Sequence, residues 1–248
     1  MSVKPEADIL ITGASSGIGL QLALDYANQG LQVIACGQNQ GRLAALSAQS
    51  NNIQTLAFNV TDLAATQAAF DSLAVIPKLI ILNAGTCEYI DNGHVDTALF
   101  KRVFDVNVFG LLHCVEAMQA HLGSQSQLVF VGSTASYIPL PRAEAYGASK
   151  AALSYIAQTL ALDLEHKGIK VTLVSPGFVK TPLTDKNDFP MPMLVTPEVA
   201  SSYIRQGIQA GNREIHFPKK FSFILKAIAL LPMGLQQSVI KRMTGKAA

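Results

Sequence analysis

A glycine-rich turn between a short apolar strand and an amphipathic helix constrains the fold of this chain more than any other stretch. Residues 9–12 are the apolar run Ile-Leu-Ile-Thr, which is typical of a buried strand. The segment Gly-Ala-Ser-Ser-Gly-Ile-Gly follows at residues 13–19, and an amphipathic stretch continues to Asn28. Such glycines allow a tight turn and a close approach of phosphate to backbone, while free N–H groups at the new helix favour an anion. The turn therefore predicts a diphosphate site at the start of the helix.

The alternation of strand and helix continues along the chain. Further strands are expected at residues 32–36, 53–58, 79–82, 127–131, 170–174 and 214–217. Because helical patterns lie between them, consecutive strands run parallel and are joined by right-handed crossovers. With 248 residues, 49% of them hydrophobic, the chain can bury one large core. We expect a single α/β domain over residues 1–248: a Rossmann-type, doubly wound parallel sheet of about seven strands with helices on both faces.

Composition narrows the functional classes. The net charge is +2 and no run of Lys or Arg occurs, which indicates no nucleic-acid partner. Three cysteines without metal or redox spacing are typical of reduced thiols in a cytoplasmic protein, and we expect no metal site. The first eight residues lack a signal-peptide pattern, and no apolar run reaches the ~18 residues that span a bilayer.

The residues after the second expected strand bear on which dinucleotide binds. A carboxylate about 20 residues past the glycine turn would grip the ribose 2′-hydroxyl of NAD. Residues 36–42 contain none, whereas Gln38, Asn39 and Arg42 can donate hydrogen bonds to a 2′-phosphate. This favours NADP(H) over NAD(H), although no arginine stands at the strand end itself. After the third strand, Asp62 is expected to accept from the adenine amino group, to cap the next helix, or both.

A tyrosine and a lysine lie four residues apart in a helix expected over about residues 145–166. Tyr146 and Lys150 therefore share one helix face, and Ser133 follows the fifth strand. A phenol has a pKa of about 10, and a neighbouring ammonium favours the phenolate and lowers that pKa. Such a tyrosine can transfer a proton near neutral pH while a serine hydroxyl holds a substrate oxygen. The alternative for the pair alone is a buried tyrosine beside a solvated lysine.

Two further polar positions stand out. The turn Asn83-Ala84-Gly85 follows the fourth strand at the carboxyl edge of the sheet, where ligands bind in open α/β folds. Asn107 lies in the middle of one long helix expected over about residues 97–121, with Gly110 just beyond it. Both residues cost helix stability relative to alanine, which suggests a kink, a water site or close packing. Alternatively, Asn107 is a satisfied core amide.

Taken together, these motifs resemble the short-chain dehydrogenase/reductase family over about residues 8–217. The resemblance rests on the glycine turn, residues 83–85, Asn107, Ser133, the Tyr146–Lys150 pair and the Pro-Gly at 176–177. It departs from the family at Leu82, where a second asparagine is common. It departs again at Gln38, where NADP-preferring members carry arginine.

The resemblance implies an oxidoreductase that transfers a hydride between C4 of a nicotinamide and a carbonyl or secondary alcohol. Ser133, Tyr146, Lys150 and Asn107 are the expected catalytic residues, Asn107 holding a water that links Lys150 to solvent. The motifs and the resemblance together give these cofactor-binding residues: Gly13, Ser15, Ser16, Gly17, Ile18, Gly19, Gln38, Asn39, Arg42, Asp62, Asn83, Gly85, Tyr146, Lys150, Pro176, Val179 and Thr181. A homodimer or homotetramer is implied. A non-catalytic NAD(P)-binding sensor is the alternative function.

Two segments concern the substrate and the surroundings of the protein. The loop over about residues 184–195 contains two prolines, two methionines and a phenylalanine, which is typical of a lid over a hydrophobic substrate and also of a loop packed on a partner subunit. The segment 221–246 is apolar, broken by Pro232, and ends in basic residues. A helix that closes the pocket or lies in a subunit interface is the preferred interpretation. An interfacial helix on a membrane is the second, and a spanning helix is disfavoured by length.

Overall fold

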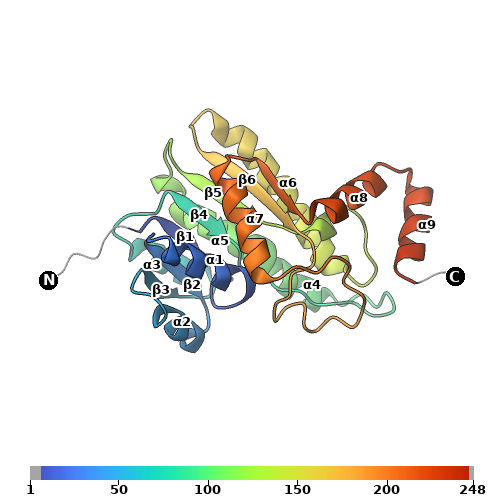
Figure 1. Ribbon diagram of the computed structural model, residues 1–248, viewed down its shortest axis with the longest axis horizontal. Helices are drawn as coiled ribbons and strands as arrows, with labels where there is room; N and C mark the ends of the chain where they lie inside the picture. The colour runs from blue at the N-terminus through green and yellow to red at the C-terminus, as the bar shows by residue number, and fades with distance from the viewer. Residues whose placement is uncertain (1–6, 246–248) are drawn as a thin grey trace.

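The computed structural model describes residues 7–245 and contains one parallel sheet of seven strands (Figure 1). In chain order the strands are β1 Ile9–Ile11, β2 Val33–Gly37, β3 Ile53–Ala57, β4 Leu79–Leu82, β5 Gln127–Val131, β6 Lys170–Pro176 and β7 Glu214–Phe217. Their order across the sheet is β3-β2-β1-β4-β5-β6-β7. The order reverses between β1 and β4, so the crevice at their carboxyl ends is the switch point at which such sheets bind ligands. The predicted doubly wound fold is confirmed.

Helices cover both faces of the sheet (Figure 1). One face carries α1 Gly17–Asn28, α2 Gln40–Ser47 and α7 Pro197–Gln209. The other carries α3 Leu63–Asp71, α5 Gly110–Met118 and α6 Glu144–Glu165, with α4 Thr97–Phe104 packed against α6. Successive strand residues point to opposite faces, so Ile9 and Ile11 join the first core and Leu10 joins the second. Continuous apolar strands are what a sheet buried on both sides requires.

The long helix expected over residues 97–121 is interrupted by a π-helical turn, Asp105–Phe109, between α4 and α5. Of the three reasons predicted for a glycine in the middle of this helix, the structure shows close packing. A Cβ added to Gly110 would lie 2.7 Å from Val60 Cγ2, so only glycine lets this helix approach the end of β3 so closely. A short 3₁₀ turn, Gln119–His121, ends the helix. The π turn widens the backbone at Asn107, which is completely buried.

The C-terminal segment forms two helices, α8 Lys219–Ala229 and α9 Met233–Met243, with the predicted break at Pro232. The two helices extend away from the sheet at the end of the molecule opposite α2 and α3 (Figure 1). Phe221, Leu225 and Ile228 are buried against Ile138 and Ile240, so the inner face of α8 has its own small core. Within residues 7–245, the helices all fall short of the length and apolar character needed to cross a bilayer.

Candidate active site

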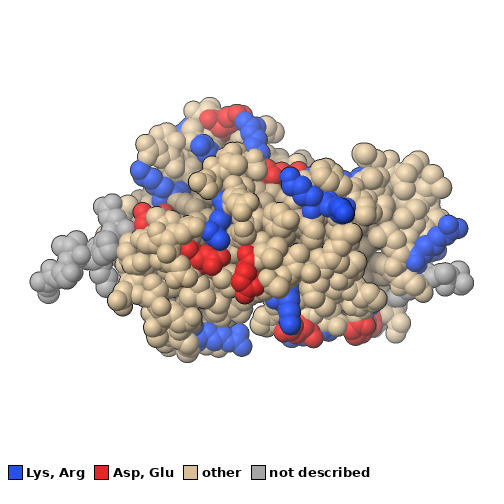
Figure 2. Space-filling model, viewed as in Figure 1, with Lys and Arg blue, Asp and Glu red and all other residues tan. Residues whose placement is uncertain are grey.

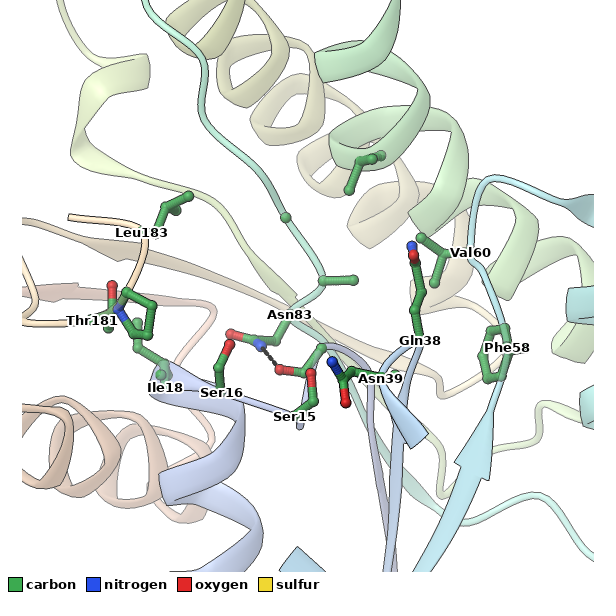
Figure 3. Close-up of a pocket in the computed structure, with 17 residues that line it drawn as sticks. Ser15, Ser16, Ile18, Gln38, Asn39, Phe58, Val60, Asn83, Thr181 and Leu183 are labelled. Carbon is green, nitrogen blue, oxygen red and sulfur yellow. Dashed lines mark hydrogen bonds between the residues drawn. The ribbon is translucent and has the colours of Figure 1, made fainter. Parts of the chain in front are cut away.

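A groove opens at the switch point, along the carboxyl ends of the central strands, and encloses about 280 Å³ (Figure 3). Loops after β1, β2, β3, β4 and β6 contribute to its walls. The lining residues are Gly13, Ser15, Ser16, Gly17, Ile18, Gly37, Gln38, Asn39, Phe58, Val60, Asn83, Ala84, Gly85, Val106, Thr181, Pro182 and Leu183. Ten of the predicted cofactor-binding residues, Gly13 among them, are therefore brought together at one groove.

The glycine turn forms one side of this groove because larger residues do not fit. Gly13 has a φ of +66°, and a Cβ there would lie 2.8 Å from the Cα of Ala84. Gly17 has a φ of +56° and lies against Thr181: an added Cβ on Gly17 would lie 3.1 Å from the Cγ2 atom of Thr181. Both glycines thus combine a left-handed backbone with a close approach, which is the requirement predicted from the turn.

The N-terminus of α1 faces the groove with its backbone donors available. Ser16 is the N-cap, but its side chain makes no capping hydrogen bond, and no acidic residue lies in the first turn. The first N–H groups of a helix have no partner within the helix, and the helix dipole adds positive potential there. This end of α1 therefore fits the diphosphate of a dinucleotide.

Thr12 and Asn83 tie the glycine turn to the end of β4. The Thr12 hydroxyl accepts from the backbone N–H groups of Asn83 (2.9 Å) and Ala84 (3.1 Å), and the Asn83 amide donates to the Thr12 carbonyl at 3.0 Å. A Cβ on Gly19 would lie 2.5 Å from the Asn83 amide nitrogen. Gly19 does not line the groove and instead makes room for Asn83, which differs from its predicted contact with the diphosphate.

The far end of the groove, beyond β2, only partly matches the predicted 2′-phosphate site. Gln38 and Asn39 line it, but Gln38 donates to the Asn59 side chain at 2.8 Å, and Asn39 accepts from the Arg42 backbone as N-cap of α2. Arg42 itself does not line the groove.

Asp62 lies outside the lining and caps α3 through the Ala65 N–H at 3.0 Å. Phe58 and Val60, which precede it, form the apolar wall instead. The family resemblance also implies that Val60 or Thr61 lies near the adenine, whereas nothing in the pattern marked Phe58. A signal was present, because both residues directly follow β3 at the edge where ligands bind.

Ser133, Tyr146 and Lys150 meet beside the other end of the groove. Ser133 follows β5, is only 8% exposed, and its hydroxyl oxygen accepts from the Ala135 N–H at 3.1 Å. The Tyr146 side chain hydrogen-bonds with Ser133, which places both hydroxyls on the same side of the sheet. Lys150 lies one turn further along α6, with its Nζ 5.9 Å from the centroid of the Tyr146 ring. An added Cβ on Gly85 would lie 3.3 Å from that Nζ, so the lysine borders the groove lining.

The protonation of this group differs from the prediction. Burial raises the pKa of Tyr146 to about 12, and the hydrogen bond with Ser133 only partly opposes the rise. Burial also lowers the pKa of Lys150 to about 8, because the residue is only 4% exposed and its ammonium group is desolvated. Its Nζ donates to the Val131 carbonyl at 2.9 Å rather than to the phenol. The expected acidic phenol is therefore wrong for the protein without a bound cofactor: desolvation outweighs the lysine.

Asn107 is positioned as a bridge between the loop after β4 and α6. Its side-chain oxygen accepts from the Thr86 N–H at 2.7 Å, and its nitrogen donates to the Thr86 carbonyl and to the Ser149 hydroxyl, both at 2.9 Å. Ser149 in turn donates to the Tyr146 carbonyl at 2.7 Å. The side chain is thus a satisfied core amide, the second of the two predicted alternatives. Its contacts hold Gly85 and the first turns of α6 in register.

Of the three residues predicted after β6, one reaches the groove. Thr181 lines it together with Pro182 and Leu183, which the sequence patterns did not mark. Pro176 ends β6 in the core, and Val179 is 3% exposed and bridges to Val195. The Thr184 hydroxyl donates to the Val179 carbonyl at 2.6 Å and accepts from the Thr181 N–H at 3.0 Å. These bonds fix the start of the loop over 184–195 at the groove.

The same loop completes an aromatic wall near the Tyr146 end of the groove. Phe189 packs edge-on against Tyr89, with ring centroids 5.5 Å apart, and against Phe178 at 6.2 Å. Phe178 also packs on Phe221 of α8 at 5.7 Å. Tyr89 and Cys87 lie within electrostatic range of Tyr146 and Lys150, so the wall adjoins the reacting groups.

Arg142 fastens this wall to the turn before α6. Its guanidinium lies 5.3 Å from the Tyr89 ring centroid, pairs with Asp91 at 2.8 Å, and donates to Asp188 in the loop. The Tyr89 hydroxyl donates to the Asn187 side chain at 2.7 Å. The sequence pattern did not mark Tyr89 or Arg142, which act through contacts between distant loops.

Comparisons with known proteins bear on the family and the fold of this chain. The model of the short chain dehydrogenase family matches residues 7–190. An uncharacterized oxidoreductase of Myxococcus xanthus is 32% identical over 243 residues, which cover 94% of this chain and 96% of that protein. The NADPH-dependent 1-acyldihydroxyacetone phosphate reductase of Schizosaccharomyces pombe is 31% identical and covers 85% of this chain and 73% of its own. A short-chain dehydrogenase structure from Streptomyces avermitilis superposes with a TM-score of 0.80 at 22% identity, over 98% of this chain and 96% of that one.

Proposed function

The chain belongs to the short-chain dehydrogenase family, and we propose that this NAD(P)-dependent oxidoreductase is an NADP(H)-preferring reductase of apolar carbonyl compounds. The observation that carries the proposal is that Ser133, Tyr146 and Lys150 lie together beside one end of a groove, next to Gly85 of its lining, and that the glycine cradle and helix N-terminus of this groove fit a dinucleotide. The nicotinamide cofactor supplies the hydride when it is bound. The residues of the chain supply its position, a hydrogen bond to the carbonyl oxygen and a proton.

Ser133 is suited to hold the substrate oxygen. Its own oxygen already accepts from the Ala135 N–H, so the hydroxyl hydrogen is left to donate. A hydrogen bond to the carbonyl oxygen strengthens as negative charge grows there during hydride addition, so it lowers the barrier rather than only binding substrate.

Tyr146 is suited to donate the proton. With its pKa raised to about 12, the phenol is fully protonated at neutral pH, and it remains a stronger acid than the alcohol that forms. Transfer from Tyr146 Oη to the alkoxide oxygen is therefore downhill, as protonation of the product in a reduction requires. Lys150 holds the ribose next to the nicotinamide through its Nζ, beside Gly85, and its cation stabilises the phenolate left behind.

Asn107 positions Tyr146 and Lys150 and does not itself contact the reacting atoms. Through Thr86 and Ser149 it fixes the backbone on both sides of the Lys150 side chain. The glycine turn and Asn83 orient the diphosphate, and Thr181 borders the carboxamide end of the groove. Together these contacts hold the reacting atoms at short range, which is where most of the rate advantage of an oriented bimolecular reaction arises.

Two observations support NADP(H). No carboxylate follows β2 to repel a 2′-phosphate. Asn39 lines the groove, and because only its side-chain oxygen is used to cap α2, its amide nitrogen can donate to a 2′-phosphate. The S. pombe relative is named as NADPH-dependent. Gln38 contributes less than expected, because its amide is engaged by Asn59.

An apolar substrate is supported by the wall of Tyr89, Phe178 and Phe189 beside the reacting groups. The wall leaves few polar partners for a charged substrate, since Arg142 is already paired with two carboxylates. We propose ketones or aldehydes that carry an aliphatic or aromatic group as the substrate class. A homodimer or homotetramer remains part of the proposal from family resemblance.

The test is the oxidation of NADPH and of NADH, followed by absorbance, with a panel of apolar and charged ketones and aldehydes. We expect turnover with apolar carbonyls and a higher kcat/KM with NADPH. Tyr146→Phe should lower kcat by about 10²–10⁴ with cofactor affinity kept. Cofactor binding without turnover of any carbonyl would instead support a non-catalytic sensor, and unchanged kcat in Tyr146→Phe would remove the tyrosine from the mechanism.

A further inference from the structure

The outer surface of the two C-terminal helices is apolar, although no other segment of residues 7–245 covers it. On α8 the inner face is buried, but Phe223 is 57% and Ile224 47% exposed on the opposite face. The connection and α9 continue the surface with Leu230 at 87%, Met233 at 74% and Leu235 at 59% exposed. Residues 219–243 thus form an arm that protrudes from the body (Figure 1), and the arm carries several exposed large apolar side chains. Contiguous exposed apolar surface of this kind marks an interaction site.

The charges of the arm have one sign only. After Glu214 the chain has six Lys or Arg residues and no Asp or Glu, whereas residues 1–214 have thirteen basic and seventeen acidic residues. The net charge of +2 therefore divides into +6 on the last segment and −4 on the rest. In Figure 2 the end of the arm is tan and blue.

Most basic residues of the arm are unpaired. In the described part of the chain, Lys219, Lys220, Lys241 and Arg242 form no ion pair, and only Lys226 has one, with Glu214. In the body, by contrast, several arginines and lysines are paired with carboxylates, for example Arg205 with Asp25. The arm therefore presents free cations at both of its ends, with apolar side chains between them.

We propose that this arm docks the protein on an anionic lipid surface. A bilayer interface accepts apolar side chains at the boundary of the acyl chains and attracts cations to its headgroups, so it matches both properties at once. Two arms packed on each other would bring like charges together, which disfavours a symmetric contact between copies. The proposal does not depend on the reaction at the groove.

Docking through the arm would place the aromatic wall close to the lipid. Phe221, on the inner face of α8, packs on Phe178 at 5.7 Å, while Phe223 and Ile224 are on the outer face of the same helix. The helix that contacts lipid on one side thus contacts the substrate wall on the other.

The test is co-sedimentation of the full chain with vesicles of phosphatidylcholine alone and of an equal mixture with phosphatidylglycerol. We expect binding to the mixture, weak binding to phosphatidylcholine, and release by salt. Lys219→Gln with Lys220→Gln should weaken binding about fivefold per charge removed. The matched control, Lys170→Gln with Lys180→Gln, removes two exposed lysines of the body and should bind like the wild type.

Phe223→Ser with Ile224→Ser should weaken binding about tenfold or more, because the apolar contact is lost. Val75→Ser, at a 50%-exposed valine of the body, is the control for that change. An unchanged melting temperature will show that these exposed positions do not affect folding. Failure of the wild type to bind either vesicle, or equal binding by all variants, would overturn the proposal. The proposal would also be overturned if the wild type bound no vesicle and light scattering showed an oligomer that the double variant Phe223→Ser with Ile224→Ser loses. A second copy of the chain would then cover the arm.

Discussion

At the scale of single residues, burial decides the chemistry of the site more than the spacing of charged groups does. Lys150 and Tyr146 share a helix face as their separation indicates, yet the lysine donates to Val131 and the phenol is shifted away from acidity. The ammonium lies 5.9 Å from the centroid of the tyrosine ring, yet the loss of hydration is the largest cause of the pKa shift of each group.

The tyrosine should therefore stay neutral over most of the accessible pH range in the cofactor-free protein. The difference between the ultraviolet titrations of the wild type and Tyr146→Phe should show no phenolate from this residue below about pH 10, its ordinary pKa. The physical reason is burial, which raises the pKa to about 12. A step in the difference titration near neutral pH would mean that the lysine acidifies the phenol after all.

The buried lysine should destabilise the protein in a pH-dependent way. Its pKa is about 8 when folded against 10.5 when unfolded, so the unfolded state binds more protons between these values and stability rises with pH across them. Below pH 8 the full penalty is present, so Lys150→Met should raise the free energy of unfolding at pH 7 by about 1–3 kcal/mol. The gain should shrink as the pH approaches 10.5. Urea unfolding at several pH values measures this, with Lys180→Met, at an exposed lysine, as the control; a gain independent of pH would refute the assignment.

At the scale of elements, the site depends on turns whose backbone only glycine can adopt and on a loop held by aromatic contacts. The turn after β1 was predictable from residues 13–19 alone, since its glycines are required locally. The aromatic wall was not, because Tyr89 comes from the connection between β4 and α4, whereas Phe178 and Phe189 come from the one between β6 and α7, and they meet only in the folded chain.

Gly13→Ala should impair cofactor binding beyond its effect on stability. Its Cβ would both sit at a positive φ and clash with Ala84 at 2.8 Å, at the edge of the groove. Gly30→Ala is a matched control, because Gly30 has a φ of +86° with no atom within 4 Å. Both variants should lose about 1 kcal/mol of stability from backbone strain, but only Gly13→Ala should lower NADP affinity by calorimetry. Equal affinities in the two variants would place the diphosphate elsewhere.

Phe189→Ala should raise KM for apolar carbonyls about tenfold and leave kcat within about twofold, because the ring contributes binding and not proton transfer. Lys186→Ala, at an exposed position of the same loop, provides the control. Steady-state kinetics with one apolar and one small polar aldehyde will separate the two effects. A loss confined to the polar substrate would contradict an apolar wall.

At the scale of the whole molecule, the groove joins loops from most of the sheet, so a bound dinucleotide should stabilise the entire domain. At a cofactor concentration about 100 times Kd, the free energy of unfolding should rise by about 2.7 kcal/mol. For a chain of this size, thermal unfolding should shift upward by about 5–10 °C. NADP should exceed NAD at equal concentration, and a larger shift with NAD would reverse the proposed preference.

The sequence was sufficient for the sheet and for the main site residues because apolar strands and glycine turns are local signals. It did not reveal the π turn at Asp105–Phe109, which arises from packing between Gly110 and the distant Val60. Nor did it show that Asp62 and Arg42 lie off the groove, since caps and ligand contacts use the same residue types. These failures all concern distances between segments far apart in the chain.

The central place of β1 has a consequence for biosynthesis. Ile9–Ile11 hydrogen-bonds on one side to β2 and on the other to β4, whose register begins at Leu79. A nascent chain therefore leaves one edge of its first strand unsatisfied until roughly a third of the protein has emerged from the ribosome. Because an open apolar edge invites pairing with other chains, newly made molecules are most vulnerable to aggregation during that interval.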